Sequence, residues 1–196
     1  MTRRLAALSL VLLAGGCATL LPPAPVDDWP ARRAALQALE AWALDGRIAV
    51  AAGENGFSGS FDWEQAGDRA EVALALPLGG PDFAISLEGE RVTLSSRGES
   101  ITDDEARVAI ADRLGQGNEL PLTAIRYWLV GVPAPGFPHD ETLSADMRLA
   151  SLEQSGWRVR YDRYEAVGEF ELPARMELTT EGLRLRVVVS QWQVRP

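Results

Sequence analysis

Apolar and polar positions alternate along much of the chain. Between residues 44 and 94, apolar side chains take every second position in several short runs, as Phe61 and Trp63 do. The alternation returns at Trp157 and Val159, and again between residues 176 and 189. Strict alternation over short runs is typical of an antiparallel sheet that is covered on one face. Most of the chain is therefore predicted to be β structure.

Three segments show helical spacing instead. The first predicted helix covers residues 28–43, with a proline in its first turn. The second covers residues 102–114, where Thr102 and Glu105 form a capping box. The third covers residues 121–131. The predicted apolar sides are, in order, Leu36, Leu39 and Trp42; Val108, Ile110, Ala111 and Leu114; and Leu122, Ile125, Trp128 and Leu129.

Helices that interrupt a series of strands predict an α+β fold. The residues alone leave two interiors open: an aromatic-rich packed core, or a curled sheet around an apolar cavity with the two middle helices over its mouth. Such a cavity holds acyl chains with about 0.8 kcal/mol per buried CH₂ group. The predicted lining residues are Phe61, Trp63, Leu74, Leu76, Ile85, Trp128 and Trp157, with Arg47 at the rim to orient polar groups.

The first 16 residues have the features of a secretory signal. Two arginines precede an apolar run from Leu5 to Ala14, which falls short of the roughly 20 residues that span a bilayer. Small residues then lead to Cys17, the only cysteine, in a pattern that resembles a bacterial lipobox. We expect cleavage after residue 16 and lipidation of Cys17. The alternative is an ordinary cleaved signal followed by an incidental thiol.

Residues 17–28 are predicted to be a lipidated tether. Three prolines and few groups that can pack favour a semi-extended segment. Ala18 stands where many Gram-negative lipoproteins carry an aspartate that retains them in the inner membrane, so we expect the outer membrane, with the chain anchored on its periplasmic side. Residues 29–196 are long enough for one domain with its own core.

Charge narrows the possible partners. Without the predicted signal the chain has 17 basic and 28 acidic residues, a net charge of −11. This balance argues against nucleic acid and against electrostatic docking on anionic lipid. Membrane contact is then expected from the lipid anchor or from exposed apolar residues.

Residues suited to catalysis or metal binding are scarce. His139, the only histidine, is expected to lie in a proline-rich loop and has no serine nucleophile motif beside it. One histidine and one lipidated cysteine cannot assemble a usual zinc site. The acidic residues 103–105 suit the first turn of a helix better than a calcium site. We expect no enzyme activity, catalytic residue, metal or cofactor, although paired carboxylates of the glycosidase kind cannot be judged from sequence.

The segment Pro77-Leu78-Gly79-Gly80-Pro81 joins two predicted strands and carries a leucine at its tip. Prolines and glycines of this kind cannot extend a strand ladder. The residues leave two interpretations open. Either Leu78 folds back on a helix, or it is exposed and enters a membrane or the groove of a partner.

Several segments, in this order and spacing behind the lipobox, resemble one family over essentially the whole mature domain. They are Trp42 with residues 44–50, Phe61-Asp62-Trp63, Leu76-Pro77-Leu78-Gly79, residues 120–122, 127–133, 154–161 and 172–178, and Trp192. The chain resembles the LolB family, the outer-membrane lipoprotein receptors of Gram-negative bacteria.

The resemblance implies an incomplete, half-open antiparallel β-barrel whose helices cover an apolar cavity for lipoprotein acyl chains. It implies that the periplasmic carrier LolA hands over lipoproteins and that the receptor inserts them into the lipid of the outer membrane. It also assigns Pro77, Leu78 and Gly79 to a membrane-delivery loop. We expect a monomer. The alternatives are a non-transferring envelope scaffold and a lipid-binding sensor.

Overall fold

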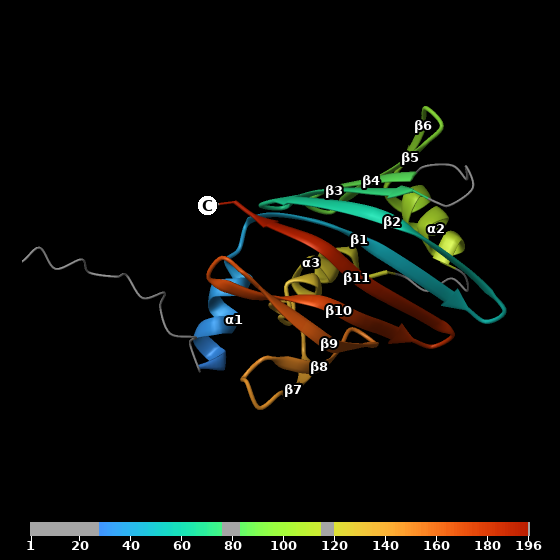
Figure 1. The fold of residues 1–196 in the computed structure, drawn as a ribbon. Coiled ribbons are helices and arrows are strands. Elements are labelled where there is room, and N and C mark those ends of the chain that lie inside the picture. The colour runs from blue at the N-terminus through green and yellow to red at the C-terminus, as the bar shows by residue number, and fades with distance from the viewer. Residues whose placement is uncertain (1–27, 76–82, 115–119, 196) are drawn as a thin grey trace, which may run out of the picture.

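The computed structural model of the 196-residue chain describes residues 28–75, 83–114 and 120–195. These ranges contain three helices and eleven strands (Figure 1). The helices are α1 (Trp29–Gln37), α2 (Asp103–Leu114) and α3 (Leu122–Leu129). The strands are β1 (Ala41–Ala52), β2 (Asn55–Ala66), β3 (Arg69–Ala75), β4 (Phe83–Glu88), β5 (Arg91–Ser96), β6 (Glu99–Thr102), β7 (His139–Leu143), β8 (Leu149–Gln154), β9 (Trp157–Val167), β10 (Phe170–Thr180) and β11 (Leu183–Val194).

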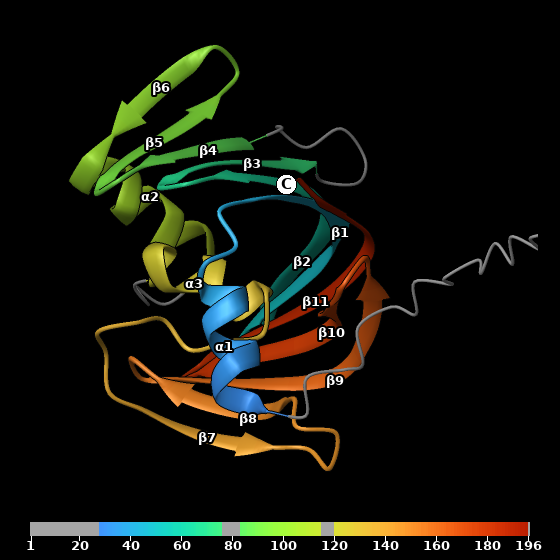
Figure 2. The same cartoon turned by 90° about the vertical axis from the view of Figure 1, so that its left-hand side faces the viewer.

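All the described strands form one antiparallel sheet in the order β6-β5-β4-β3-β2-β1-β11-β10-β9-β8-β7. Strands that follow each other in sequence pair with each other, except β6 and β7, and β1 also pairs with β11 in the middle of the sheet. The two ends of the sheet, β6 and β7, do not pair with each other. Figure 2 shows the sheet curling into an open C. The predicted half-open antiparallel barrel of the α+β class is confirmed.

The three helices lie on the concave side of this C (Figure 2). α1 precedes β1, whereas α2 and α3 lie in the long connection from β6 to β7, between the two ends of the sheet. α2 packs on β5 and β6, and α3 buries most of its residues against the core. No helix in the described ranges has the length and apolar character needed to cross a membrane.

The first helix is shorter than its sequence pattern predicts. It ends at Gln37, and Trp42 and Ala43 belong to β1 instead of the helix. The indole of Trp42 stacks on Trp63 at 6.0 Å between ring centroids and meets Trp192 edge-on at 5.4 Å. These partners lie on β2 and β11, so packing between distant segments overrides the local helical spacing.

The second helix begins where predicted, directly after Thr102, but its buried side differs. Val108 was expected on the apolar side and is 60% exposed. Ile110 is buried as expected, and Ala106 is buried where Val108 was expected to be. Positions four residues apart share one face of a helix, and this pair defines the face that packs on β5 and β6.

Three strands have no clear signal in the sequence. They are β6, β7 and β8, and the first two form the ends of the sheet. His139 was expected in a loop and is instead the first residue of β7, with 26% of its side chain exposed. An end strand pairs on one side only and is half solvated, so β7 does not need the apolar alternation of a central strand.

Candidate functional site

Partly exposed apolar side chains cover one part of the concave face. Strand register places Phe83 beside Leu74, and Ile85 between Val72 and Leu94. Val72 and Leu94 are buried, which identifies this face as the inner one. Five inward residues on neighbouring strands β1 to β4 pack on the core and yet remain partly exposed. We call them the concave strip: Ile48, Phe57, Leu74, Phe83 and Ile85.

Helix α2 covers the β4 end of the concave strip. In this helix, the guanidinium carbon of Arg113 lies 4.6 Å from the centroid of the Phe83 ring. Arg113 also donates a hydrogen bond from Nη1 to the carbonyl of Ala109, and Ala109 packs on the core beside the strip. A cation over an aromatic face contributes about 0.5–1 kcal/mol at an exposed site. Arg113 is thus a cation that borders the strip, and the sequence pattern gives no hint of this contact.

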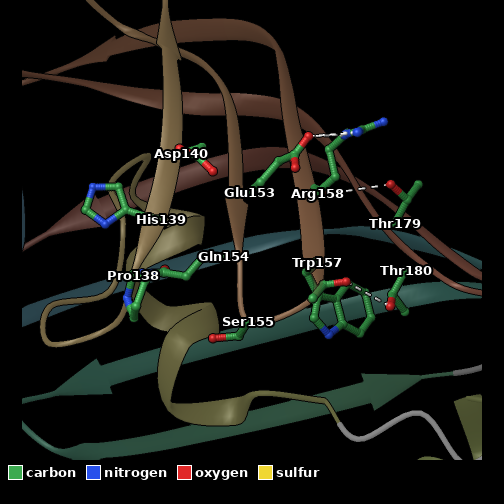
Figure 3. Close-up of a pocket in the computed structure, with 11 residues that line it drawn as sticks. Pro138, His139, Asp140, Glu153, Gln154, Ser155, Trp157, Arg158, Thr179 and Thr180 are labelled. Carbon is green, nitrogen blue, oxygen red and sulfur yellow. Dashed lines mark hydrogen bonds and ion pairs between the residues drawn. The ribbon is translucent and has the colours of Figure 1, made fainter.

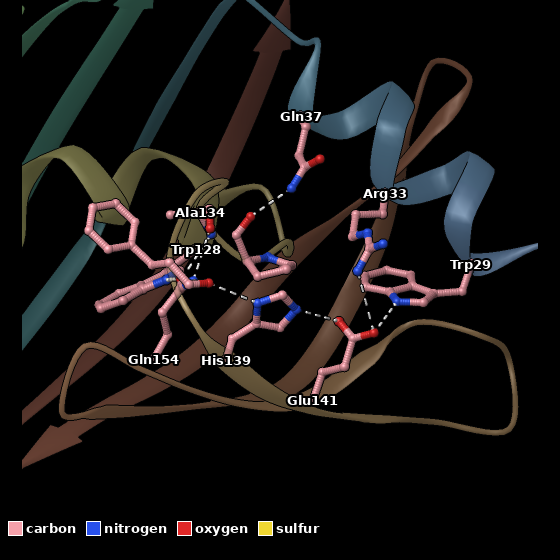
Figure 4. Close-up of polar contacts among 10 residues, drawn as sticks. Trp29, Arg33, Gln37, Trp128, Ala134, His139, Glu141 and Gln154 are labelled. Atoms are coloured by element: carbon pink, nitrogen blue, oxygen red, sulfur yellow. Dashed lines mark hydrogen bonds and ion pairs between the residues drawn. The ribbon is translucent and has the colours of Figure 1, made fainter.

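The other half of the concave face is filled by side chains. Trp128 of α3 is completely buried, and its ring lies 6.3 Å from that of Trp157 on β9. The amide of Gln154 accepts hydrogen bonds from Trp128 Nε1 at 2.8 Å and from the backbone N–H of Ala134 at 2.9 Å. Gln154 Nε2 donates in turn to the carbonyl of Ala134 at 2.9 Å (Figure 4). These two tryptophans therefore belong to a packed, hydrogen-bonded core.

The predicted lining residues fall into two groups. Leu74 and Ile85 belong to the concave strip, whereas Phe61 and Trp63 face inward but are each only 5% exposed. The indole N–H of Trp63 donates to the buried side-chain oxygen of Gln65 at 3.0 Å. Leu74 and Ile85 are therefore the more exposed of the predicted lining residues, whereas Phe61, Trp63, Trp128 and Trp157 are almost completely buried.

The expectation that Arg47 lies at the cavity rim is wrong. Arg47 follows Gly46 and precedes Ile48, both of which face inward, and successive strand residues point to opposite faces. Its partners in the register are Ser60 and Val188 on the outer face. The side chain of Arg47 therefore points away from the concave strip. Cys17, Leu76, Pro77, Leu78 and Gly79 lie outside the described residues.

The pocket drawn in Figure 3 is polar and does not suit an acyl chain. It has a volume of about 580 Å³ and opens near the ends of β7 to β10. Among its lining residues, Arg158 donates two hydrogen bonds to Glu153, at 2.9 and 2.7 Å, and Thr180 donates one to the carbonyl of Gly156. Trp157 contributes one wall, although most of this side chain is buried.

Helix α1 is fixed across the opening by polar contacts (Figure 4). The indole N–H of Trp29 donates to Glu141 of β7 at 2.7 Å, and the guanidinium of Arg33 lies 3.7 Å from the same carboxylate. Gln37 donates to the carbonyl of Pro133 at 2.9 Å. His139 Nε2 lies 3.7 Å from the second oxygen of Glu141. These contacts join the first helix to β7 and to the loop after α3.

Two phenols beneath α3 stay neutral. Burial raises the pKa of Tyr161 and of Tyr164 well above the ordinary value for tyrosine. Tyr161 donates its hydroxyl proton to the carbonyl of Trp128 at 2.9 Å, and Tyr164 donates to that of Leu149 at 2.7 Å. Both groups act as fixed hydrogen-bond donors that hold α3 and β8 in place.

Comparison with known proteins agrees with this architecture. The family description "Outer membrane lipoprotein LolB" matches residues 40–192, which include nearly the whole sheet. The chain belongs to the LolB family. A relative named outer-membrane lipoprotein LolB from Nitrosococcus oceani is 38% identical over 193 residues, covering 95% of this chain and 94% of the relative. A second, from Pseudomonas paraeruginosa, is 32% identical over 197 residues, covering 97% and 95%.

Solved structures add the fold. A LolA superfamily protein from Nitrosomonas europaea aligns over 86% of this chain and 94% of its own, with a TM-score of 0.54 and 12% identity. A DUF1329 family protein from Desulfovibrio piger covers 86% and 91%, with a TM-score of 0.56 and 8% identity. At these identities the likeness concerns the open curled sheet alone. The LolB-family sheet is thus shared with proteins of other names.

Proposed function

We propose that this LolB-family chain is a lipoprotein receptor of the outer membrane. It accepts lipoproteins from a periplasmic carrier of the LolA type, binds their acyl chains on the concave strip, and inserts them into the membrane. The observation that carries this proposal is the strip itself, which offers partly exposed apolar side chains on a concave surface. Core residues of a domain without a ligand are normally buried more completely.

The transfer we propose needs no covalent step. Acyl chains move from carrier to receptor if the receptor binds them more tightly, and on into the bilayer if the bilayer binds them better still. A tenfold preference corresponds to about 1.4 kcal/mol, and burying one CH₂ group contributes about 0.8 kcal/mol. Small differences in apolar contact therefore suffice to give the transfer a direction.

Each part of the chain has a role in this proposal. Residues 1–16 are the signal, Cys17 is lipidated, residues 17–28 are the tether, and residues 29–196 form the receptor domain, which acts as a monomer. Leu78 enters the membrane during delivery, as the family resemblance implies. In the described part of the domain, Leu74 and Ile85 contact the acyl chains, and Arg113 orients polar groups beside them.

The deciding experiment uses residues 17–196 with Cys17→Ala, mixed with carrier that is loaded with an acylated lipoprotein. This chain keeps every residue that the structure describes. A pull-down then shows which protein holds the lipoprotein. We expect the lipoprotein to move to the receptor. If a folded receptor leaves the lipoprotein on its carrier, the proposal is wrong, and an envelope scaffold or a lipid sensor becomes the better interpretation.

A further inference from the structure

The outer face of the sheet concentrates arginines, although the chain is acidic. Register places Arg47 and Arg175 on either side of Val188, and Arg163 beside Arg175, so three arginines share one row across β1, β11, β10 and β9. A parallel row holds Arg186, Glu177 and Arg160. Seven arginines of this region are exposed. Leaving out Arg158, which pairs with Glu153, we call the other six the arginine face: Arg47, Arg160, Arg163, Arg175, Arg184 and Arg186.

Few carboxylates neutralise the arginine face. Glu177 lies 3.7 Å from Arg160 and 3.2 Å from Arg186, and Asp162 lies 3.0 Å from Arg160. Within the described ranges, Arg47, Arg163 and Arg175 make no ion pair. Asp45 and Asp62 also point outward, next to Arg47 and Ser60. Six cations against these four carboxylates leave a local charge of +2, whereas the whole chain carries −9. The remainder of the chain therefore carries −11, so positive charge is concentrated on this face.

The surface beside Arg47 is low and open. Arg47 and Arg186 border a shallow groove of about 450 Å³ whose floor consists mainly of small side chains, including Ala49, Ser60 and Ala75. Small neighbours leave both guanidinium groups accessible to a flat or bulky anion. Ala75 is also the last described residue before the segment that contains Leu78. The groove thus begins next to the point where the chain enters the predicted delivery loop.

We propose that the arginine face docks on anionic lipid headgroups of the target membrane. A guanidinium group binds a phosphate oxygen pair through two parallel hydrogen bonds and is always charged. Attraction to an anionic membrane adds about fivefold in affinity for each arginine near the surface. The net charge alone argued against such docking, and the segregation of charge across the sheet reverses that argument. This inference rests on the proposed function, in which the chain delivers lipoproteins into that membrane.

The test measures binding to vesicles. Residues 17–196 with Cys17→Ala are sedimented with vesicles of phosphatidylcholine alone or of phosphatidylcholine with phosphatidylglycerol. We expect binding to the phosphatidylglycerol vesicles only, and loss of that binding at high salt. In the double variant Arg47→Gln/Arg175→Gln we expect about thirtyfold weaker binding, from the fivefold contribution of each arginine.

A charge-matched control separates the face from net charge. Arg91→Gln/Arg97→Gln removes two exposed arginines from β5 and the turn after it, and we expect it to bind like the parent. Equal binding to both vesicle types, or an equal loss in both double variants, overturns the inference. Normal vesicle binding with lost binding to carrier also overturns it and points to an acidic protein partner. Lipoprotein pull-down without vesicles tests the proposed function separately, and we expect Arg47→Gln/Arg175→Gln to accept lipoprotein normally.

Discussion

The ring of Phe61 lies against the backbone of Gly46. The two residues are directly opposite each other in β2 and β1. A Cβ atom on Gly46 would be 2.9 Å from Cε1 of Phe61 and 2.7 Å from the carbonyl oxygen of Val188. Neither approach is possible without movement, because real Cβ contacts are longer. The absence of a side chain at Gly46 therefore lets Phe61 pack at the centre of the sheet, next to the β1–β11 junction.

Replacing Gly46 with alanine is expected to destabilise the domain by about 1–3 kcal/mol, the usual range for overpacking a core. The backbone of β11 cannot move away without disturbing its pairing with β1. Urea denaturation of Gly46→Ala measures the effect. Ser60→Ala changes an exposed neighbour on β2 and should leave the midpoint unchanged. An unaltered midpoint in Gly46→Ala would mean that Phe61 and the β11 backbone shift to accommodate the new methyl group without loss of stability.

Gln154 is expected to be the most sensitive polar residue of the core. Its amide pairs with the indole of Trp128 and with both backbone groups of Ala134. Gln154→Leu leaves three buried groups without partners, at about 1–3 kcal/mol for each. We expect a loss of at least about 3 kcal/mol in the free energy of unfolding, measured by denaturation. Gln193→Leu on the exposed side of β11 is the control.

Asp62 faces Asp45 across β1 and β2. Partial loss of hydration, together with the neighbouring Asp45 carboxyl, raises the pKa of Asp62 above its ordinary value. The native state therefore holds its proton to a higher pH than the unfolded chain does, and stability falls as pH rises through the raised pKa. We expect Asp62→Asn to stabilise the domain at neutral pH by about 0.5 kcal/mol, as for relief of like charges in opposed strand positions.

The measurement compares melting temperatures of Asp62→Asn and the parent from acidic pH, near the ordinary pKa of aspartate, up to neutral pH. The advantage of the variant should grow as pH rises, because only the parent develops the second charge. Asp112→Asn removes an exposed carboxylate from α2 and serves as the matched control. A constant difference at every pH would show that repulsion from Asp45 is not the cause.

The outline of the fold follows from alternation, but its edges and pairings do not. Alternating runs identify the central strands because one face of each is buried. The same reasoning fails for Trp42. Its spacing suits a helix, and only its contacts with Trp63 and Trp192 show why it lies in a strand. Those partners are about 20 and 150 residues away in sequence, beyond any local pattern.

The candidate site, too, could be predicted from the sequence only in part. Alternation with Ile48 already indicates that Arg47 points outward, so its assignment to the rim conflicted with the pattern itself. Local sequence cannot reveal that Arg175 shares the row of Arg47, because this depends on the pairing of β1 and β10 with β11. Nor can it distinguish Trp128, completely buried, from Ile85, partly exposed, since both occupy inward apolar positions.

Ile85 offers the sharpest test of the concave strip. Ile85→Asp places a charge among the apolar side chains that we expect to contact acyl chains, and burying a carboxylate without a partner is strongly unfavourable. We expect at least about tenfold weaker uptake of lipoprotein, equivalent to about 1.4 kcal/mol. Ala84→Asp adds the same charge to the exposed face of the same strand and should accept lipoprotein normally. Normal uptake by a folded Ile85→Asp variant would remove β4 from the binding surface.

Leu78 separates acceptance from delivery. The family resemblance assigns it to the membrane, where burying a leucine contributes about 1.5–3 kcal/mol, and a glutamate in its place opposes entry into lipid. We expect Leu78→Glu to take lipoprotein from the carrier as the parent does and to insert at least about tenfold less into vesicles. Leu78→Met keeps the apolar character and should insert normally. If Leu78→Glu also fails to accept lipoprotein, Leu78 serves uptake; if it inserts normally, the loop does not enter the membrane.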